Sequence, residues 1–338
     1  SVNGNDSVKG VWVTNHEYTD DGLLHPGGME PWTSEKVKKS QAAHGVSICV
    51  IEKSASGDWF VVADSRARRI TANTPCLVSG PAAGHELMRT QYDPTGKLVF
   101  GTVNNCANGV TPWGTYLTCE ENFNGYFVKS DKPSLQESRV GIDSKGFGYR
   151  WHEHDDRFNL DKHPNEVNRF GWVVEIDPNN PQSQPVKRTA LGRFKHEGAV
   201  VTIAKNNKVV VYMGDDQKSE YIYKFVSRRQ FNSSNLQANK ALLDEGVLYV
   251  GRFDADGSGR WIALEHNRNG LTAENGFPSQ AYILINARLA ADFVGATPMD
   301  RPEWIAVNPN NQDVYASLTN NTDRGVKLPL NAANPRPS

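Results

Sequence analysis

Cysteine is scarce in this sequence, with 4 residues among 338. A fold held together by disulfides would need many more, so we exclude a disulfide scaffold. Long apolar runs are missing as well: none approaches the roughly 18 residues that span a bilayer, and we expect no membrane insertion. Neither sign of charge dominates, because 38 acidic side chains face 37 basic ones. This balance argues against a nucleic-acid-binding surface and against an acidic disordered chain.

Helical periodicity is also scarce, and only segments 35–43 and 235–244 fit it. Short, β-rich apolar runs dominate instead, separated by turn residues such as Asp256-Gly257. We expect strands at 10–13, 46–51, 59–63, 98–103, 114–118, 171–176, 209–213, 221–226, 247–253, 261–264, 304–307 and 314–318. Many short strands at such spacing are typical of an all-β sandwich, barrel or propeller.

A weak internal repeat favours the β-propeller. The same order of features occurs twice, from Glu197 to Asp216 and from Glu303 to Asn321. Each unit begins with a Glu and a short strand, continues through an Asn-Asn turn and a second strand, and ends in a pair of oxygen-bearing side chains. Segments 116–122 and 12–17 resemble the end of such a unit. Units of about 40–60 residues would give about six blades. We therefore expect residues 1–338 to form a single propeller domain, with a loop insertion around 130–169.

The repeated strand ends carry the strongest chemical signal. In a propeller, strand ends converge on an axial pocket, where close carboxylates repel one another unless a cation neutralises them. Hard oxygen ligands of this kind suit Ca²⁺. The alternative for any one end is an ordinary solvated turn, and its repetition along the chain favours the ion site.

Three further residues are candidates for this pocket. Cys106 lies in a polar turn and could ligate a metal as a thiolate, whereas Cys49 lies in an apolar strand and is predicted to be a small buried hydrophobe. Arg301 lies two residues before Glu303 and suits a phosphate-like anion, which arginine binds bidentately. The alternative for that pair is a weak surface ion pair. His196, beside Glu197, could be a further axial group.

Two other motifs resemble metal sites. The segment 254–265 matches an EF-hand loop, but strand-like sequence flanks it, so we predict a β-hairpin with an Asp-Gly turn. His152, His154 and His163 are zinc-type ligands in charged, strand-poor sequence, for which we predict a solvated loop. The sequence has no serine-hydrolase elbow, phosphate-binding P-loop or dinucleotide fingerprint.

Seven segments, taken in order, match one known pattern: 15–19, 104–106, 111–122, 168–172, 195–199, 214–216 and 301–304. With these segments the chain resembles the PhoX-type alkaline phosphatases over essentially its whole length, and 111–122 is specific by itself. The resemblance implies a six-bladed propeller with an axial cluster of ferric iron and calcium that hydrolyses phosphomonoesters.

The resemblance also implies a role for each matched residue. Iron would be held by Cys106, Glu197 and Glu303, and phosphate by Arg301. Calcium carboxylates would be Glu121, Asp216 and Glu17, while Glu120 remains an alternative to Glu121. These roles are chemically consistent, because ferric iron is a hard Lewis acid and a multi-metal cluster neutralises charge during phosphoryl transfer.

Members of this family are longer at both ends, so we expect a truncated propeller with little activity by itself. The resemblance also implies a periplasmic or secreted protein, and we expect a monomer that acts on a small phosphomonoester. Two alternatives remain open: a calcium-dependent propeller lactonase or esterase, and a non-catalytic propeller that binds an anionic ligand or a partner protein. Metal content would separate the three, because only the phosphatase needs both iron and calcium.

Overall fold

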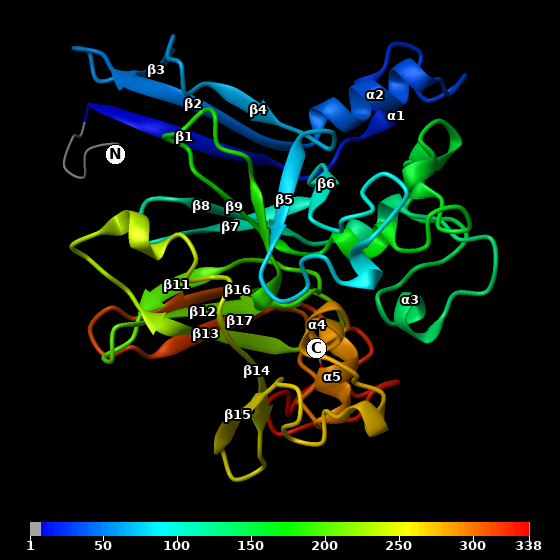
Figure 1. Cartoon of the computed structure of the whole chain (residues 1–338), viewed down its shortest axis with the longest axis vertical. Coiled ribbons are helices and arrows are strands. Elements are labelled where there is room, and N and C mark those ends of the chain that lie inside the picture. Colours follow the sequence, from blue (N-terminus) through cyan, green and yellow to red (C-terminus); the bar gives the residue numbers. More distant parts are fainter. Residues whose placement is uncertain (1–7, 338) are drawn as a thin grey trace.

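The computed structural model describes residues 8–337, which fold into four separate β-sheets with five short α-helices. Three of the sheets follow one below another, and the helices gather along one side of them (Figure 1). Within the described residues, no helix is both long and apolar enough to cross a bilayer.

The first sheet is built around β2 (Gly45–Lys53), which pairs antiparallel with β1 (Lys9–His16) on one side. On its other side β2 pairs with both β3 (Trp59–Val62) and β4 (Arg68–Ile70). Helices α1 (Asp21–Leu24) and α2 (Ser34–Ala43) connect β1 to β2. The helix predicted at 35–43 is confirmed, and it begins where the Thr33 side chain accepts a hydrogen bond from Lys36 N.

The second sheet has six strands in the order β6-β5-β10-β9-β8-β7, and every pair is antiparallel except β5 with β10. The strands are β5 (Pro75–Ser79), β6 (Leu98–Phe100), β7 (Asn105–Val110), β8 (Tyr116–Glu120), β9 (Val173–Ile176) and β10 (Val186–Arg188). The connection from β8 to β9 is the long insertion, which holds the short helix α3 (Leu135–Arg139).

This insertion is not the solvated loop that its charge predicts. Trp151, Phe158 and Leu160 are buried in it and belong to one hydrophobic cluster with Val99 and Phe170. The sequence-based expectation was wrong because the charged residues separate a small number of large apolar side chains, and these supply the core of the segment.

The third sheet is a five-stranded antiparallel meander in chain order. Its strands are β11 (Val200–Ile203), β12 (Lys208–Gly214), β13 (Ile222–Gln230), β14 (Gly246–Phe253) and β15 (Gly259–Ala263). The hairpin predicted at the EF-hand-like segment is confirmed, since β14 and β15 pair across a turn closed by Asp254 N and Ser258 O at 2.9 Å.

The prediction of a helix at 235–244 is wrong. Only a 3₁₀ turn, Leu236–Asn239, forms there. The Asn235 side chain caps this turn, and the Asn239 amide donates to the carbonyl of Asn232 at 2.8 Å. Such local bonds from asparagine side chains compete with a regular helix.

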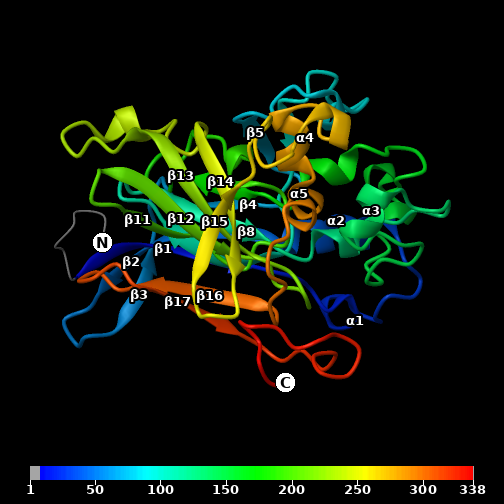
Figure 2. The ribbon, with the colours of Figure 1, turned by 90° about the horizontal axis from the view of Figure 1, so that it is seen from below.

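The fourth sheet contains only β16 (Pro302–Val307) and β17 (Val314–Leu318). It lies beside β11 and β12 (Figure 2). Two helices precede it, α4 (Gln280–Ile285) and α5 (Ala287–Phe293), and the sequence analysis predicted neither. Their buried residues Ile283, Leu284 and Ala290 pack into the main core with Phe225 and Leu248 of the third sheet.

The predicted β-rich fold is confirmed, because a strand lies in each of the twelve segments expected. Five α-helices are also present within residues 8–337, so the fold is mostly β rather than all-β. The described residues form four separate sheets, and these do not make a closed propeller.

Hydrogen bonds to backbone carbonyls nevertheless join the sheets at their edges. Ala107 N of β7 donates to Glu197 O at 3.0 Å, just before β11 begins. The Asn15 side chain at the end of β1 donates to the carbonyls of Cys106 and Ala107 at 3.1 and 3.0 Å. These bonds bring the first, second and third sheets together at one place.

Gly109 allows the closest of these approaches. A Cβ atom on Gly109 would lie 1.8 Å from the carbonyl oxygen of Ala199. Glycine, which has no Cβ, fits at this position, whereas any other residue would require one of the two backbones to move.

We therefore expect Gly109→Ala to lower the free energy of unfolding by about 1–3 kcal/mol, the usual cost of forcing atoms into a packed site. Urea unfolding would measure it. The matched control is Gly10→Ala in β1, where the nearest atom to a new Cβ lies at 4.0 Å, so that change should stay within about 0.5 kcal/mol of the unmodified chain. Equal urea midpoints for the two variants would contradict this interpretation.

Candidate metal centre

The acidic residues predicted at strand ends come together at the place where the sheets meet. Glu17 follows β1, Cys106 lies in β7 and Glu121 follows β8. Glu197 precedes β11, Asp216 follows β12 and Glu303 lies in β16. The polypeptide holds them close, because Glu197 N donates to Gly214 O at 3.1 Å and Asp216 N donates to Lys195 O at 3.1 Å.

Two groups of these side chains have the spacing of a metal site. In Glu17, Cys106 and Glu121, one potential ligand atom from each residue lies within 4.8 Å of the others, and the same holds for Glu121, Glu197 and Asp216. Glu121 belongs to both groups and so links them. The Cys106 thiol donates to Glu197 Oε2 at 3.3 Å, which brings the sulfur against the second group.

Arg301 and Glu303 complete this cluster. The Arg301 guanidinium donates to both oxygens of Asp216, at 3.0 and 2.8 Å, and its Nη2 lies 3.7 Å from Glu303 Oε1. The Arg301 backbone has a φ of 48°, a conformation that residues other than glycine seldom adopt. Its side chain is 36% exposed, so the guanidinium is partly open to solvent.

Burial and mutual repulsion raise the pKa values of carboxylates in this cluster. Burial, reinforced by the charges of Asp216 and Glu197, raises the pKa of Glu121 to about 8. Burial and the nearby Glu303 raise the pKa of Glu197 to about 7, although its hydrogen bond from the Cys106 thiol opposes the shift.

The remaining members show the same trend. Burial and the charge of Asp216 raise the pKa values of both Glu17 and Glu303. Burial, with the charge of Glu197, raises the pKa of the Cys106 thiol above its usual range. Groups that resist ionisation in this way become fully charged when a cation lies between them. The donor set of carboxylates and one thiol therefore fits metal ions.

The structure separates Glu120 from Glu121, which the sequence left as alternatives. Glu120 is fully buried and pairs with Lys187 Nζ at 2.7 Å, while its other oxygen accepts from Gly171 N and Trp172 N at 2.9 and 3.0 Å. It belongs to the core, and only Glu121 faces the cluster. Successive side chains of an extended strand point to opposite faces, which separates these neighbours.

The same alternation excludes His196, which the sequence analysis offered as a partner of Glu197. The His196 ring is buried, lies 2.9 Å from Gly192 O through Nε2, and stacks on Phe194 with ring centroids 3.7 Å apart. Asp215 likewise turns away from the cluster and is held by Arg288, whereas its neighbour Asp216 faces Arg301.

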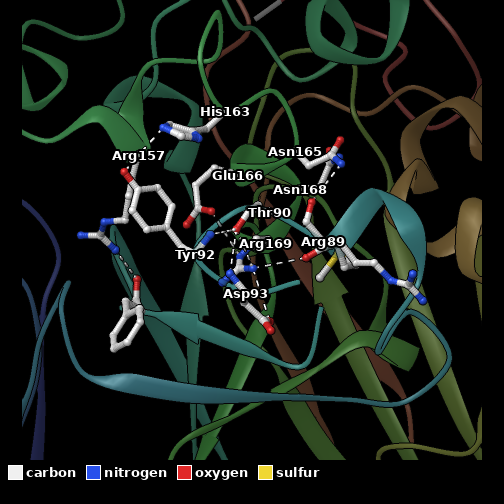
Figure 3. A network of polar contacts seen from close by, with 12 residues as sticks. Arg89, Thr90, Tyr92, Asp93, Arg157, His163, Asn165, Glu166, Asn168 and Arg169 are labelled. Atoms are coloured by element: carbon white, nitrogen blue, oxygen red, sulfur yellow. Dashed lines mark hydrogen bonds and ion pairs between the residues drawn. The ribbon is translucent and has the colours of Figure 1, made fainter. Parts of the chain in front are cut away.

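The histidines of the insertion form no metal group with other residues of the part of the chain described. His163 packs against Tyr92 with ring centroids 4.9 Å apart, at the edge of a polar network that contains Glu166 and Arg169 (Figure 3). His154 Nε2 lies 3.2 Å from the Trp32 carbonyl. Zinc-type residue identity alone was a poor guide in this segment.

Sequence reasoning missed three polar residues around the cluster. Asn15, Asn104 and Lys195 all contact its backbone or its neighbours. Each lies within one of the matched segments, but the spacing along the chain gave no indication that the Asn15 amide joins β1 to β7.

Comparison with known proteins identifies the family of this chain. A family model, alkaline phosphatase PhoX, matches residues 1–338, and the chain belongs to this family. A solved structure with the same overall fold is described as "Pseudomonas fluorescens PhoX in complex with vanadate, a transition state analogue". The two chains are 50% identical with a TM-score of 0.95, and the match covers 98% of this chain but 60% of that one. A search of curated proteins found no match.

The different surroundings of Glu120 and Glu121 predict losses of stability of very different size in metal-free protein. Glu120→Gln leaves the Lys187 ammonium buried without its carboxylate, and we expect a loss of about 3–5 kcal/mol in the free energy of unfolding. Glu121→Gln removes one charge from a repulsive cluster, and we expect a loss below about 1 kcal/mol. Urea unfolding after chelation would compare them. A larger loss for Glu121→Gln would show that the two roles have been reversed.

Proposed function

We propose that this chain carries the catalytic centre of an alkaline phosphatase that hydrolyses phosphate monoesters with the help of iron and calcium. The observation that carries the proposal is the convergence of five carboxylates, a thiol and a guanidinium from separate sheets. Family membership and the 50% identity to a PhoX enzyme that binds vanadate support it.

Two kinds of ligand in the cluster support two kinds of metal. We assign ferric iron to Cys106, Glu197 and Glu303, because a thiolate is a poor ligand for calcium and a good one for a transition metal. We assign calcium to Glu121, Asp216 and Glu17, which offer oxygen only. When bound, the metals would supply charge neutralisation for the phosphoryl group as it is transferred.

Arg301 is the residue of this chain that we propose binds phosphate. Its planar guanidinium already forms two parallel bonds to a carboxylate, which is also the geometry with which arginine binds phosphate oxygens. Its partial exposure lets a substrate reach it, and Glu303 beside it limits the positions that the guanidinium can adopt.

The remaining expectations belong to the same proposal. We propose that the whole protein completes a β-propeller around this cluster, functions in the periplasm or outside the cell, and is a monomer. The separate sheets with their edges joined at the cluster are consistent with such a ring. The alternative of a calcium-dependent lactonase is disfavoured by the Cys106 thiol within the cluster, since that class needs oxygen ligands alone.

Metal analysis tests the iron assignment directly. We expect protein loaded with iron and calcium to retain both metals, and Cys106→Ala to lose the iron because its sulfur ligand is gone. Elemental analysis of the purified proteins would measure this. Cys49→Ala is the matched control, because Cys49 lies in β2 away from the ligand groups, and it should retain iron. Calcium alone in the unmodified chain would favour the lactonase, and unchanged iron in Cys106→Ala would refute the ligand assignment.

Replacement of Arg301 tests the proposed phosphate contact. Arg301→Lys keeps the charge but loses the bidentate geometry, at a cost of about 1.5–3 kcal/mol for hydrogen bonds to a charged group. We therefore expect vanadate binding and kcat/KM for p-nitrophenyl phosphate to fall about 10–100-fold.

Arg229→Lys is the matched control for this change. Arg229 forms an exposed ion pair with Glu245, near the end of β13 remote from Gly214 and the cluster. The Arg229→Lys variant should therefore bind vanadate and turn over substrate like the unmodified chain. Equal values for Arg301→Lys and Arg229→Lys would exclude a phosphate contact at Arg301.

A further inference from the structure

Asn122 connects the central carboxylate of the cluster to a buried cation. Its amide Nδ2 donates to Glu121 Oε1 at 2.6 Å, and its Oδ1 accepts from Lys195 Nζ at 3.1 Å. Lys195 is only 5% exposed. Neither residue is among the predicted metal ligands, and the roles assigned so far leave both unexplained.

The backbone beside Asn122 is held from a second direction by Asn104. The Asn104 carbonyl accepts from Glu121 N at 2.9 Å, and its side-chain Oδ1 accepts from Asn122 N at 2.6 Å. Asn104 itself has a φ of 48°, and its amide donates to the Tyr126 hydroxyl at 3.3 Å. The turn that carries Glu121 is therefore fixed both through its backbone and through a side chain.

The Tyr126 hydroxyl is fixed in turn by His44. Burial lowers the pKa of His44 to about 4, so its ring is neutral at pH 7. Nδ1 lies 2.7 Å from the Ser40 carbonyl, which cannot donate, so the ring proton resides there. Nε2 then accepts from the Tyr126 hydroxyl at 2.9 Å, which leaves the phenolic oxygen free to accept from Asn104.

Glu121 is the residue whose orientation matters most, because it belongs to both groups of potential ligands. A free carboxylate on a flexible side chain would turn away from its acidic neighbours. The amide donor from Asn122 holds one oxygen in place, and the Lys195 ammonium on the far side of the amide offsets part of the local negative charge.

We propose that Asn122, supported by Lys195, is a positioning residue that orients Glu121 for cation binding. The inference rests on the proposed metal-dependent function. Asn122 does not serve as a ligand itself, because its oxygen already accepts from an ammonium group, which would repel a second cation. Outer partners of this kind typically contribute about 10–100-fold to metal affinity.

Two substitutions at this position distinguish positioning from direct ligation. Asn122→Ala removes the donor, and calcium binding measured by titration calorimetry should weaken about 10–100-fold. Asn122→Asp keeps an acceptor for Lys195 but turns a carboxylate oxygen toward Glu121, so it should weaken binding at least as much. If Asn122 were a direct ligand, Asn122→Asp would bind calcium as tightly as the unmodified chain or more tightly, and the proposal would be overturned.

Asn124 supplies the matched control two residues along the same turn. Its amide donates to Gly141 O at 2.9 Å, away from Glu121. Asn124→Ala deletes the same atoms from a buried site, so it should lower thermal stability without changing calcium affinity by more than about threefold, well below the effect expected at Asn122. Equal weakening by both alanine variants would reduce the Asn122 effect to a general loss of structure and refute positioning.

Lys195→Met supplies a second variant that keeps an unbranched side chain, one atom shorter, but removes its charge. We expect it to weaken calcium binding in the same direction as Asn122→Ala, and unchanged affinity would remove Lys195 from the proposal. The outcomes also separate the two hypotheses. An unmodified chain that binds no calcium refutes the proposed function and this inference together. Normal binding and hydrolysis in all Asn122 variants refutes the inference alone.

Discussion

The mutual repulsion of buried carboxylates is the constraint on which this site depends. Within residues 8–337, Glu17, Glu121, Glu197, Asp216 and Glu303 lie near one another, and Arg301 is the cation that pairs with them. Desolvated negative charges at such spacing oppose the contact that brings them together. The contact persists because it is made by the backbone, through the bonds from Ala107 to Glu197 and from Glu197 to Gly214. The energy of pairing strand edges thus offsets the cost of assembling a site suited to cations.

Glycine makes that pairing possible at two positions. A Cβ on Gly109 would lie 1.8 Å from Ala199 O, and a Cβ on Gly214 would lie 2.6 Å from Glu303 O. The first contact joins the second sheet to the third, and the second joins β12 to β16. Both lie within a few residues of potential ligands, so the distance between ligands is set by how closely the sheets approach.

Local pattern was sufficient to predict the strands and the residues at their ends, because alternation and turn chemistry act over a few residues. It failed for α4 and α5, which are only six and seven residues long and bury most of their apolar residues, so that the helical period is too short to recognise. It also could not show how the four sheets are arranged, because their arrangement depends on contacts between distant segments. The repeat along the chain indicated carboxylates at strand ends and the family resemblance assigned a metal to each, whereas the roles of Lys195 and Asn122 became visible only when distances in space were known.

Alternation along extended backbone explains how one strand end can serve both stability and the site. Three neighbouring pairs divide in the same way: Glu120 pairs with Lys187 while Glu121 faces the cluster, His196 stacks on Phe194 while Glu197 faces it, and Asp215 binds Arg288 while Asp216 faces it. The member of each pair that points into the core contacts a buried partner there, which anchors the backbone. The member that faces the cluster can then lie close to other carboxylates, since its position does not depend on its own interactions alone. A site that needs carboxylates close together for metal binding is stable because the adjacent residues are held by contacts in the core.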